Sequence, residues 1–341
     1  MTYRNIRHKS KMRNAIILTG SLRTIKRTAK FTRRNILECN KNNECDLFIC
    51  IQNDSQEPDE KWEEWFHKEF NCIKSIVWFS YGYYQEWFRW RDKQLNNIPL
   101  EDYWRNFLKI GGSTIEYAQL QIAYTNMVEF EIKQRIKYDY IVRTRTDSIF
   151  SKPVDFHWLH WTLKDIEERR DRIKNTLISL NLPSEDIDVF KAFMCTVISD
   201  DVISNLSNII AMCQYVPNPT ETTFPKSVEE IYDYIHKGRY ILTIRKNHLY
   251  IVRRDLFHII PSLGYFYGCF KTDRDECWFN AESQFRDMCY YSCVSIIEYT
   301  TLFEERSLMM PYEWNEREFF DENFEVREDC KDKILWCCVR K

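Results

Sequence analysis

Apolar and polar positions alternate in a regular way through the first half of the chain. Short apolar runs, typical of strands buried in a sheet, are separated by longer stretches with an apolar stripe at helical spacing. The expected strands cover residues 15–19, 45–51, 75–79 and 138–142. The expected helices cover residues 24–39, 59–70 and 115–136. This alternation of strand and helix favours a mostly parallel sheet with helices on both faces.

The longest expected helix follows Gly111 and Gly112. Its apolar stripe is formed by Ile115, Ala118, Ile122, Ala123, Val128 and Ile132. By contrast, residues 81–103 mix aromatic and charged side chains without a clear period, and we interpret them as an irregular insertion. This half of the chain therefore predicts one α/β unit interrupted by an insertion.

The second half of the chain is less regular. The expected strands here cover residues 188–199, 240–244, 248–252 and 294–298. The expected helices cover residues 200–212 and 281–293, and residues 215–226 are expected to form a proline-containing loop. No linker divides the chain, so we predict one domain over residues 13–300. A basic, disordered leader at 1–12 is expected before it and an acidic C-terminal extension at 301–341 after it.

The composition supports a folded domain. Of the 341 residues, 44% are hydrophobic and 16% aromatic, which excludes a disordered chain. The net charge is only −2, yet residues 1–37 hold 11 Lys or Arg and no acid. Residues 304–329 hold 10 acids against 3 Arg. The basic segment suggests an anionic ligand nearby, although the absence of zinc-finger or RRM patterns argues against nucleic acid as a partner.

Several classes of protein are excluded by missing patterns. No run of 18 apolar residues predicts a transmembrane helix, and no apolar segment of signal-peptide length is seen. The 13 cysteines are therefore expected to be reduced, and the protein to be cytoplasmic, or in the host cytoplasm or virion if it is viral. Walker A, GxGxxG, HExxH, GxSxG and kinase motifs are absent.

The most informative motif lies at the end of the strand predicted at 138–142. Because side chains alternate along a strand, Arg143, Arg145 and Asp147 share one face if the strand continues that far. Ligands of open α/β sheets bind at the carboxyl ends of the strands. There, arginines can bind phosphate and an aspartate can hold a divalent cation. The alternative is an internal Arg–Asp pair that only organises the strand end.

A second motif lies where the first expected strand meets a helix. Thr19, Gly20, Ser21 and Arg23 form this turn, and glycine allows close backbone approach. The N-terminus of a helix favours an anion, and Arg23 lies in its first turn. A plain strand-to-helix turn is the alternative interpretation. The two motifs together predict a diphosphate site at the ends of two strands of one sheet.

These motifs and their order resemble a group of uncharacterised GT-A-type glycosyltransferases of bacteria and large DNA viruses. The likeness covers residues 14–150 and consists of a G-x-L-R turn and an R-x-R-x-D strand end. It implies a GT-A-like (Rossmann-like), mostly parallel central sheet flanked by helices, with a C-terminal extension. It further implies transfer of a sugar from a nucleotide-sugar donor, a UDP-sugar being favoured, to a glycan or glycoprotein acceptor.

The family's strand-end aspartate corresponds to Asp147. The usual Asp-x-Asp motif is Arg145-Thr146-Asp147 here, so its first acid is missing. Asp147 would be the ligand of Mn²⁺ or Mg²⁺; alternatively the arginines neutralise the leaving diphosphate without a metal. Thr19, Gly20, Ser21, Arg23, Arg143, Arg145 and Asp147 are the predicted donor-binding residues.

An inverting transferase also needs a base that deprotonates the acceptor hydroxyl. Glu282, in the first turn of the expected helix at 281–293, and Asp188, at the start of an expected strand, are the candidates. A helix-terminal carboxylate and a surface acid, respectively, are the alternatives. Two other functions stay open: a non-catalytic glycan- or partner-binding protein with a degenerate GT-A fold, and a sugar nucleotidyltransferase.

Overall fold

The computed structural model describes residues 12–40, 44–52, 60–79, 85–96, 98, 101–109, 112–151, 153–154, 240–244, 249–266, 281–292, 294–298, 316–330 and 336–338. Most of the predicted leader lies outside these residues. The strand predicted at 188–199, which begins at Asp188, the helix at 200–212 and the loop at 215–226 also lie outside them. Within the described parts of the chain, no helix has the length and apolar character needed to cross a bilayer.

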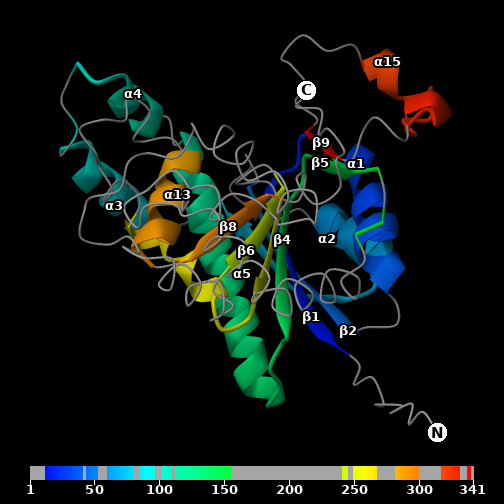
Figure 1. The fold of residues 1–341 in the computed structure, drawn as a ribbon, viewed down its shortest axis with the longest axis horizontal. Coiled ribbons are helices and arrows are strands. Elements are labelled where there is room, and N and C mark those ends of the chain that lie inside the picture. The colour runs from blue at the N-terminus through cyan, green and yellow to red at the C-terminus, as the bar shows by residue number, and fades with distance from the viewer. Residues whose placement is uncertain are drawn as a thin grey trace, which may run out of the picture.

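A seven-stranded sheet forms the centre of the molecule, in the order β3-β2-β1-β4-β7-β6-β8 (Figure 1). Its strands are β1 (Arg13–Ser21), β2 (Glu44–Gln52), β3 (Ile73–Phe79), β4 (Tyr140–Arg145), β6 (Tyr240–Ile244), β7 (Leu249–Arg253) and β8 (Ser295–Glu298). Among the described strand pairs of this sheet, those made by β7 are antiparallel and the others are parallel. The predicted α/β class with a mostly parallel sheet and helices against it is therefore confirmed.

Helices cover both faces of this sheet, as Figure 1 shows. One layer holds α1 (Ile25–Thr32) and α2 (Glu60–Glu69), and the other holds α5 (Gly112–Gln134) and α13 (Ala281–Tyr291). Side chains of β1 alternate between the two layers: Ala15 and Ile17 join the core under α5, and Ile16 and Leu18 join the core under α1 and α2. Burial on both faces explains why this strand is a continuous apolar run.

Two long helices differ in detail from their predictions. After α1 the chain continues as a π-helical turn at Arg33–Leu37 and a 3₁₀ turn at Glu38–Asn40, so the predicted 24–39 helix is present but irregular. In α5 the prediction that Ile132 lies on the buried face was wrong, because its side chain is 72% exposed. Glu131 occupies the buried face in that turn, and the next residue is rotated by about 100° around the helix.

The insertion predicted as irregular at 81–103 contains a regular helix in its described part, which corrects the sequence interpretation. It contains α3 (Gln85–Leu95), and α4 (Tyr103–Lys109) follows it. Side-chain hydrogen bonds hold the two helices together. Arg105 donates to the carbonyls of Leu95 and Ile98, and Arg91 donates to the carbonyl of Lys109. These tertiary contacts involve long charged side chains, which is why a search for apolar periodicity does not find the helices.

The described parts of the C-terminal extension pack against the main unit. A short strand, β9 (Trp336–Cys338), pairs antiparallel with β5 (Ser148–Phe150), and α15 (Glu316–Phe319) begins the segment at 316–330. Phe320 and Phe324 contact Phe31 of α1 edge to face. The acidic extension thus lies on the helix that follows β1, near the upper end of the sheet in Figure 1.

Candidate functional site

The predicted site lies at the point where the chain order of the sheet reverses. From β1 the chain passes through α1 to β2 on one side, and β4 pairs with β1 on the other side. The helices that follow β1 and precede β4 pack on opposite faces of the sheet, so the carboxyl ends of β1 and β4 open between them. In doubly wound α/β proteins ligands bind at this switch point.

Gly20 shapes the turn at the end of β1. Its φ of +142° is unfavourable for other residues, and a Cβ at this position would collide with the side chain of Thr146. Gln119 of α5 donates a hydrogen bond to the Gly20 carbonyl at 2.8 Å. The close approach predicted for this glycine is present, and its partner in the structure is the turn after β4.

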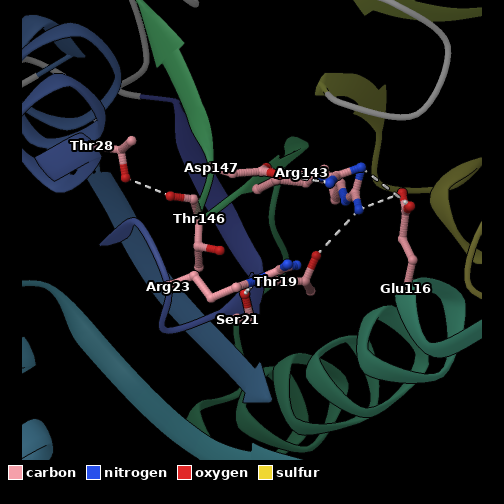
Figure 2. Close-up of polar contacts among 9 residues, drawn as sticks. Thr19, Ser21, Arg23, Thr28, Glu116, Arg143, Thr146 and Asp147 are labelled. Atoms are coloured by element: carbon pink, nitrogen blue, oxygen red, sulfur yellow. Dashed lines mark hydrogen bonds and ion pairs between the residues drawn. The ribbon is translucent and has the colours of Figure 1, made fainter. Parts of the chain in front are cut away.

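That turn is anchored by Thr146. Its amide donates to the carbonyl of Thr19 at 2.9 Å, and its own carbonyl accepts from the hydroxyl of Thr28 in α1 (Figure 2). The ends of β1 and β4 and the first helix are thereby joined at one residue. A rigid backbone of this kind can hold the neighbouring side chains in defined positions.

Arg143 lies in β4 and is completely buried. Its Nη2 is 2.6 Å from a carboxylate oxygen of Glu116 in α5 and 3.3 Å from the hydroxyl of Thr19 (Figure 2). Within the described part of the chain, its Nε and Nη1 have no hydrogen-bond partner. Because a buried charge is costly unless paired, Glu116 is essential for this arginine.

Arg145 and Asp147 form a two-pronged ion pair. The Nε and Nη2 of Arg145 lie 2.9 and 2.7 Å from the two carboxylate oxygens of Asp147. Strand β4 ends at Arg145, so Asp147 lies in the turn rather than on the strand face. Their side chains are 20% and 18% exposed, and the second oxygen of Glu116 is 3.5 Å from Arg145. The internal Arg–Asp pair considered for this motif is therefore present, at a partly exposed position.

Of the remaining donor-binding candidates, Ser21 ends β1, and Arg23 lies in the turn before the N-cap of α1 rather than in the first helical turn as predicted. Arg23 is exposed, and its Nε donates to the hydroxyl of Ser21 at 3.0 Å. Thr24, the N-cap of α1, makes no side-chain capping hydrogen bond. The N-terminus of α1 and the Arg23 guanidinium thus lie beside the Gly20 turn, where both favour an anion.

The candidate base Glu282 lies in the first turn of α13 and is half-buried. The preceding carbonyl, of Ala281, accepts a hydrogen bond from Tyr117 of α5 at 3.0 Å. Further along α13, Phe285 stacks on Tyr250, which pairs with Arg143 across β4 and β7. The structure therefore connects the start of α13 to the neighbourhood of Arg143, while Asp188 lies outside the described residues.

A metal held by protein side chains alone does not fit the described residues. No group of three or more His, Cys, Asp or Glu side chains gathers among them. Both oxygens of Asp147 accept hydrogen bonds from Arg145 in this structure. The Mn²⁺ or Mg²⁺ predicted at Asp147 stays a prediction, and it would require Arg145 to release this carboxylate.

Glu116 is the site residue that the sequence interpretation missed. It is an acid in the second turn of a helix whose neighbouring positions, Ile115 and Ala118, were identified as apolar. Glu116 and Gln119 are three residues apart, a spacing that places two polar side chains on one side of α5. That pair of polar residues near the helix start was the available signal.

Comparison with known proteins does not identify a family. No model of a known protein family matches the sequence, and no curated protein matches it. The resemblance to GT-A glycosyltransferases therefore stays a hypothesis from the sequence motifs. The geometry of the switch point is therefore the basis for inferring the function.

Proposed function

We propose that this protein is a GT-A-type glycosyltransferase that transfers a sugar from a nucleotide-sugar donor, a UDP-sugar being favoured, to a glycan or protein acceptor. The observation that carries the proposal is the position of Arg23 and Arg145. Both side chains lie beside the Gly20 turn at the switch point of a mostly parallel sheet. This is the place where such sheets bind nucleotides.

The chemistry of the site suits a diphosphate. A guanidinium binds phosphate oxygens through two parallel hydrogen bonds, and Arg145 already binds a carboxylate in this way. The N-terminus of α1 adds a favourable dipole, and the positive φ of Gly20 shapes the turn that leads into this helix. We infer that these groups bind the two phosphates of the donor.

The same groups would assist the reaction. As the acceptor oxygen bonds to the anomeric carbon of the sugar, the bond from that carbon to the diphosphate breaks, and Arg145 and Arg23 would stabilise the negative charge on the leaving diphosphate. Glu282, at the start of α13, is the proposed base for the acceptor hydroxyl, and Asp188 is the second candidate. The cations that the described residues offer to this mechanism are the guanidinium groups of Arg23 and Arg145, and a Mn²⁺ or Mg²⁺ at Asp147 stays a prediction.

The test is a thermal-shift panel with UDP, GDP, CMP and UDP-sugars, each with and without Mn²⁺. A ligand at 100 times its Kd stabilises the folded state by about 2.7 kcal/mol, which raises Tm by a few degrees. We expect one nucleotide class to stabilise the wild type and to lose most of this effect in Arg145→Gln. Arg253→Gln, which removes an exposed arginine at another strand end, is the matched control. The absence of any shift would remove the support for the donor site.

A second candidate function is a non-catalytic protein that retains the nucleotide or glycan site. The observation that favours it is that Asp147, the remaining acid of the Asp-x-Asp position, is bound by Arg145 on both oxygens. The two functions differ in turnover. A transferase should release UDP slowly from its UDP-sugar when water replaces the acceptor, and Glu282→Gln should slow transfer to an acceptor. A binding protein should bind the sugar nucleotide and leave it intact.

A further inference from the structure

The ion pair between Arg145 and Asp147 has the geometry of a bound anion. The carboxylate of Asp147 receives the Nε and Nη2 hydrogens of Arg145 at 2.9 and 2.7 Å, the arrangement that a phosphate oxygen pair would also adopt. Both side chains reach the surface, whereas Arg143 is completely buried. An incoming anion can therefore reach Arg145 but cannot reach Arg143 without a larger rearrangement.

Among the described residues, two carboxylates face the two arginines of this cluster. Arg143 and Arg145 are matched by Glu116 and Asp147, and Glu116 lies closer to Arg143, at 2.6 Å, than to Arg145, at 3.5 Å. If Glu116 moved away, Arg143 would be a buried charge without its partner, which is unfavourable. Of the two carboxylates, Asp147 is thus the one that can leave.

The backbone around Asp147 permits this exchange. Thr146 is held by the carbonyl of Thr19 and by the hydroxyl of Thr28, so the turn keeps its position. Asp147 follows β4 in that turn, and a change of its side-chain rotamer would move its carboxylate away from the guanidinium while Thr146 stays in place.

We propose that Asp147 occupies the diphosphate position of Arg145 in the ligand-free protein and is displaced from it when a nucleotide diphosphate binds. Asp147 is then a built-in competitor of the donor rather than a ligand that recruits it. This inference rests on the proposed donor site and specifies how that site is regulated. It gives the opposite prediction from a metal-binding role, in which loss of Asp147 weakens binding.

The experiment is calorimetric titration of the full-length protein with UDP, GDP and inorganic pyrophosphate in the presence of EDTA. We expect Asp147→Asn to bind the nucleotide about three- to fivefold more tightly, since a partly exposed ion pair competes by about this factor. Arg145→Gln should weaken binding at least tenfold. Asp255→Asn is the matched control, because Asp255 forms an ion pair with Arg253 at the same sequence spacing but next to β7. It should leave binding unchanged.

The outcomes separate the two levels of the proposal. If the wild type binds UDP or GDP but Asp147→Asn binds more weakly or equally, the exchange is wrong while the donor site stands. If, in a parallel titration with Mn²⁺ in place of EDTA, Mn²⁺ tightens binding to the wild type but not to Asp147→Asn, Asp147 is a metal ligand. If none of the three probes binds to any variant, the donor site itself is wrong and the exchange with it. Asp147→Ser must reproduce the tighter binding, and the unliganded Tm of both variants checks that they fold.

Discussion

Two strand ends of this protein carry an arginine and an aspartate two residues apart, and only one of them lies at the candidate site. Arg145 and Asp147 follow β4, and Arg253 and Asp255 follow β7; their closest ion-pair distances are 2.7 and 2.9 Å. Because β7 runs antiparallel to β4, Arg253 pairs with Tyr140 at the start of β4. The Arg145 motif therefore lies at the carboxyl end of β4, and the Arg253 motif lies beside its amino end. The motif by itself predicts an ion pair. The direction of its strand decides whether that pair lies where the sheet binds ligands.

Each of these partly exposed ion pairs is accompanied by a more buried ion pair, and the two strand ends differ in this second pair. At the end of β7 Arg254 donates from Nε and Nη2 to Glu131 and from Nη1 to the hydroxyl of Tyr124. At the switch point Nε and Nη1 of Arg143 lack a partner within the described residues. A fully satisfied network stabilises a fold, whereas buried donors without acceptors require another explanation. Among the described residues the two networks thus differ: each side-chain nitrogen of Arg254 has an acceptor, whereas Arg143 keeps one ion-paired nitrogen and lies over the ring of Tyr250.

The largest expected effect is on stability, when the carboxylate that pairs with a buried arginine is removed. Glu116→Ala leaves the guanidinium of Arg143 without its partner and should lower the free energy of unfolding by about 3–5 kcal/mol. Glu131→Ala should have a similar effect through Arg254. Urea unfolding at neutral pH measures both changes. A loss below about 1 kcal/mol for Glu116→Ala would mean that Arg143 has another source of stabilisation.

Paired substitutions then separate stability from function. Arg143→Met with Glu116→Leu, and Arg254→Met with Glu131→Leu, should each regain most of the stability, because apolar residues can replace a buried ion pair. Only the first pair should weaken nucleotide binding, since Glu116 also contacts Arg145. Equal effects of the two paired substitutions on binding would contradict the functional difference between the two strand ends.

The strands next to the site could be predicted from the sequence for a physical reason. Strands buried on both faces, such as β1 and β2, are uninterrupted apolar runs, and the Arg143-to-Asp147 motif is local to one strand end. Glu116 and the pairing of β5 with β9 could not be predicted in this way. They bring together residues far apart in the chain, and a local pattern specifies which face of an element is buried but not what covers it.

A smaller effect is expected at the turn that joins the two strand ends. Gly20→Ala forces a side chain into a backbone conformation that non-glycine residues avoid, against the side chain of Thr146. We expect a cost of about 1–3 kcal/mol and weaker nucleotide binding, measured by thermal unfolding and titration. Ser21→Ala, in the same turn without the positive φ, controls for stability. If Gly20→Ala unfolds like the wild type, the close approach of the two turns is not needed for the fold.

The smallest effect concerns the C-terminal segment that packs on the helix leading away from the switch point. Burial raises the pKa of Glu325, but the hydrogen bond from Lys30 and the charge of Arg34 outweigh it, so the pKa is lower than usual. A carboxyl with a lowered pKa in the folded state stabilises the fold above its unfolded pKa of about 4.3. This contribution is lost as the pH falls through the folded-state pKa.

Glu325→Gln should therefore destabilise the protein by less than about 1 kcal/mol at pH 7, and by progressively less as the pH is lowered from the unfolded pKa of about 4.3 through the folded-state pKa. The measurement is the Tm difference between wild type and variant across this pH range, with the exposed neighbour Glu322→Gln as the control. If the Tm values of wild type and Glu325→Gln converge at low pH, the stabilisation comes from the ion pairs of Glu325. A difference that persists at low pH would instead place the contribution in packing near Phe324, whose ring lies 3.9 Å from the Arg27 guanidinium. The segment would then be held to α1 independently of the basic side chains that pair with Glu325.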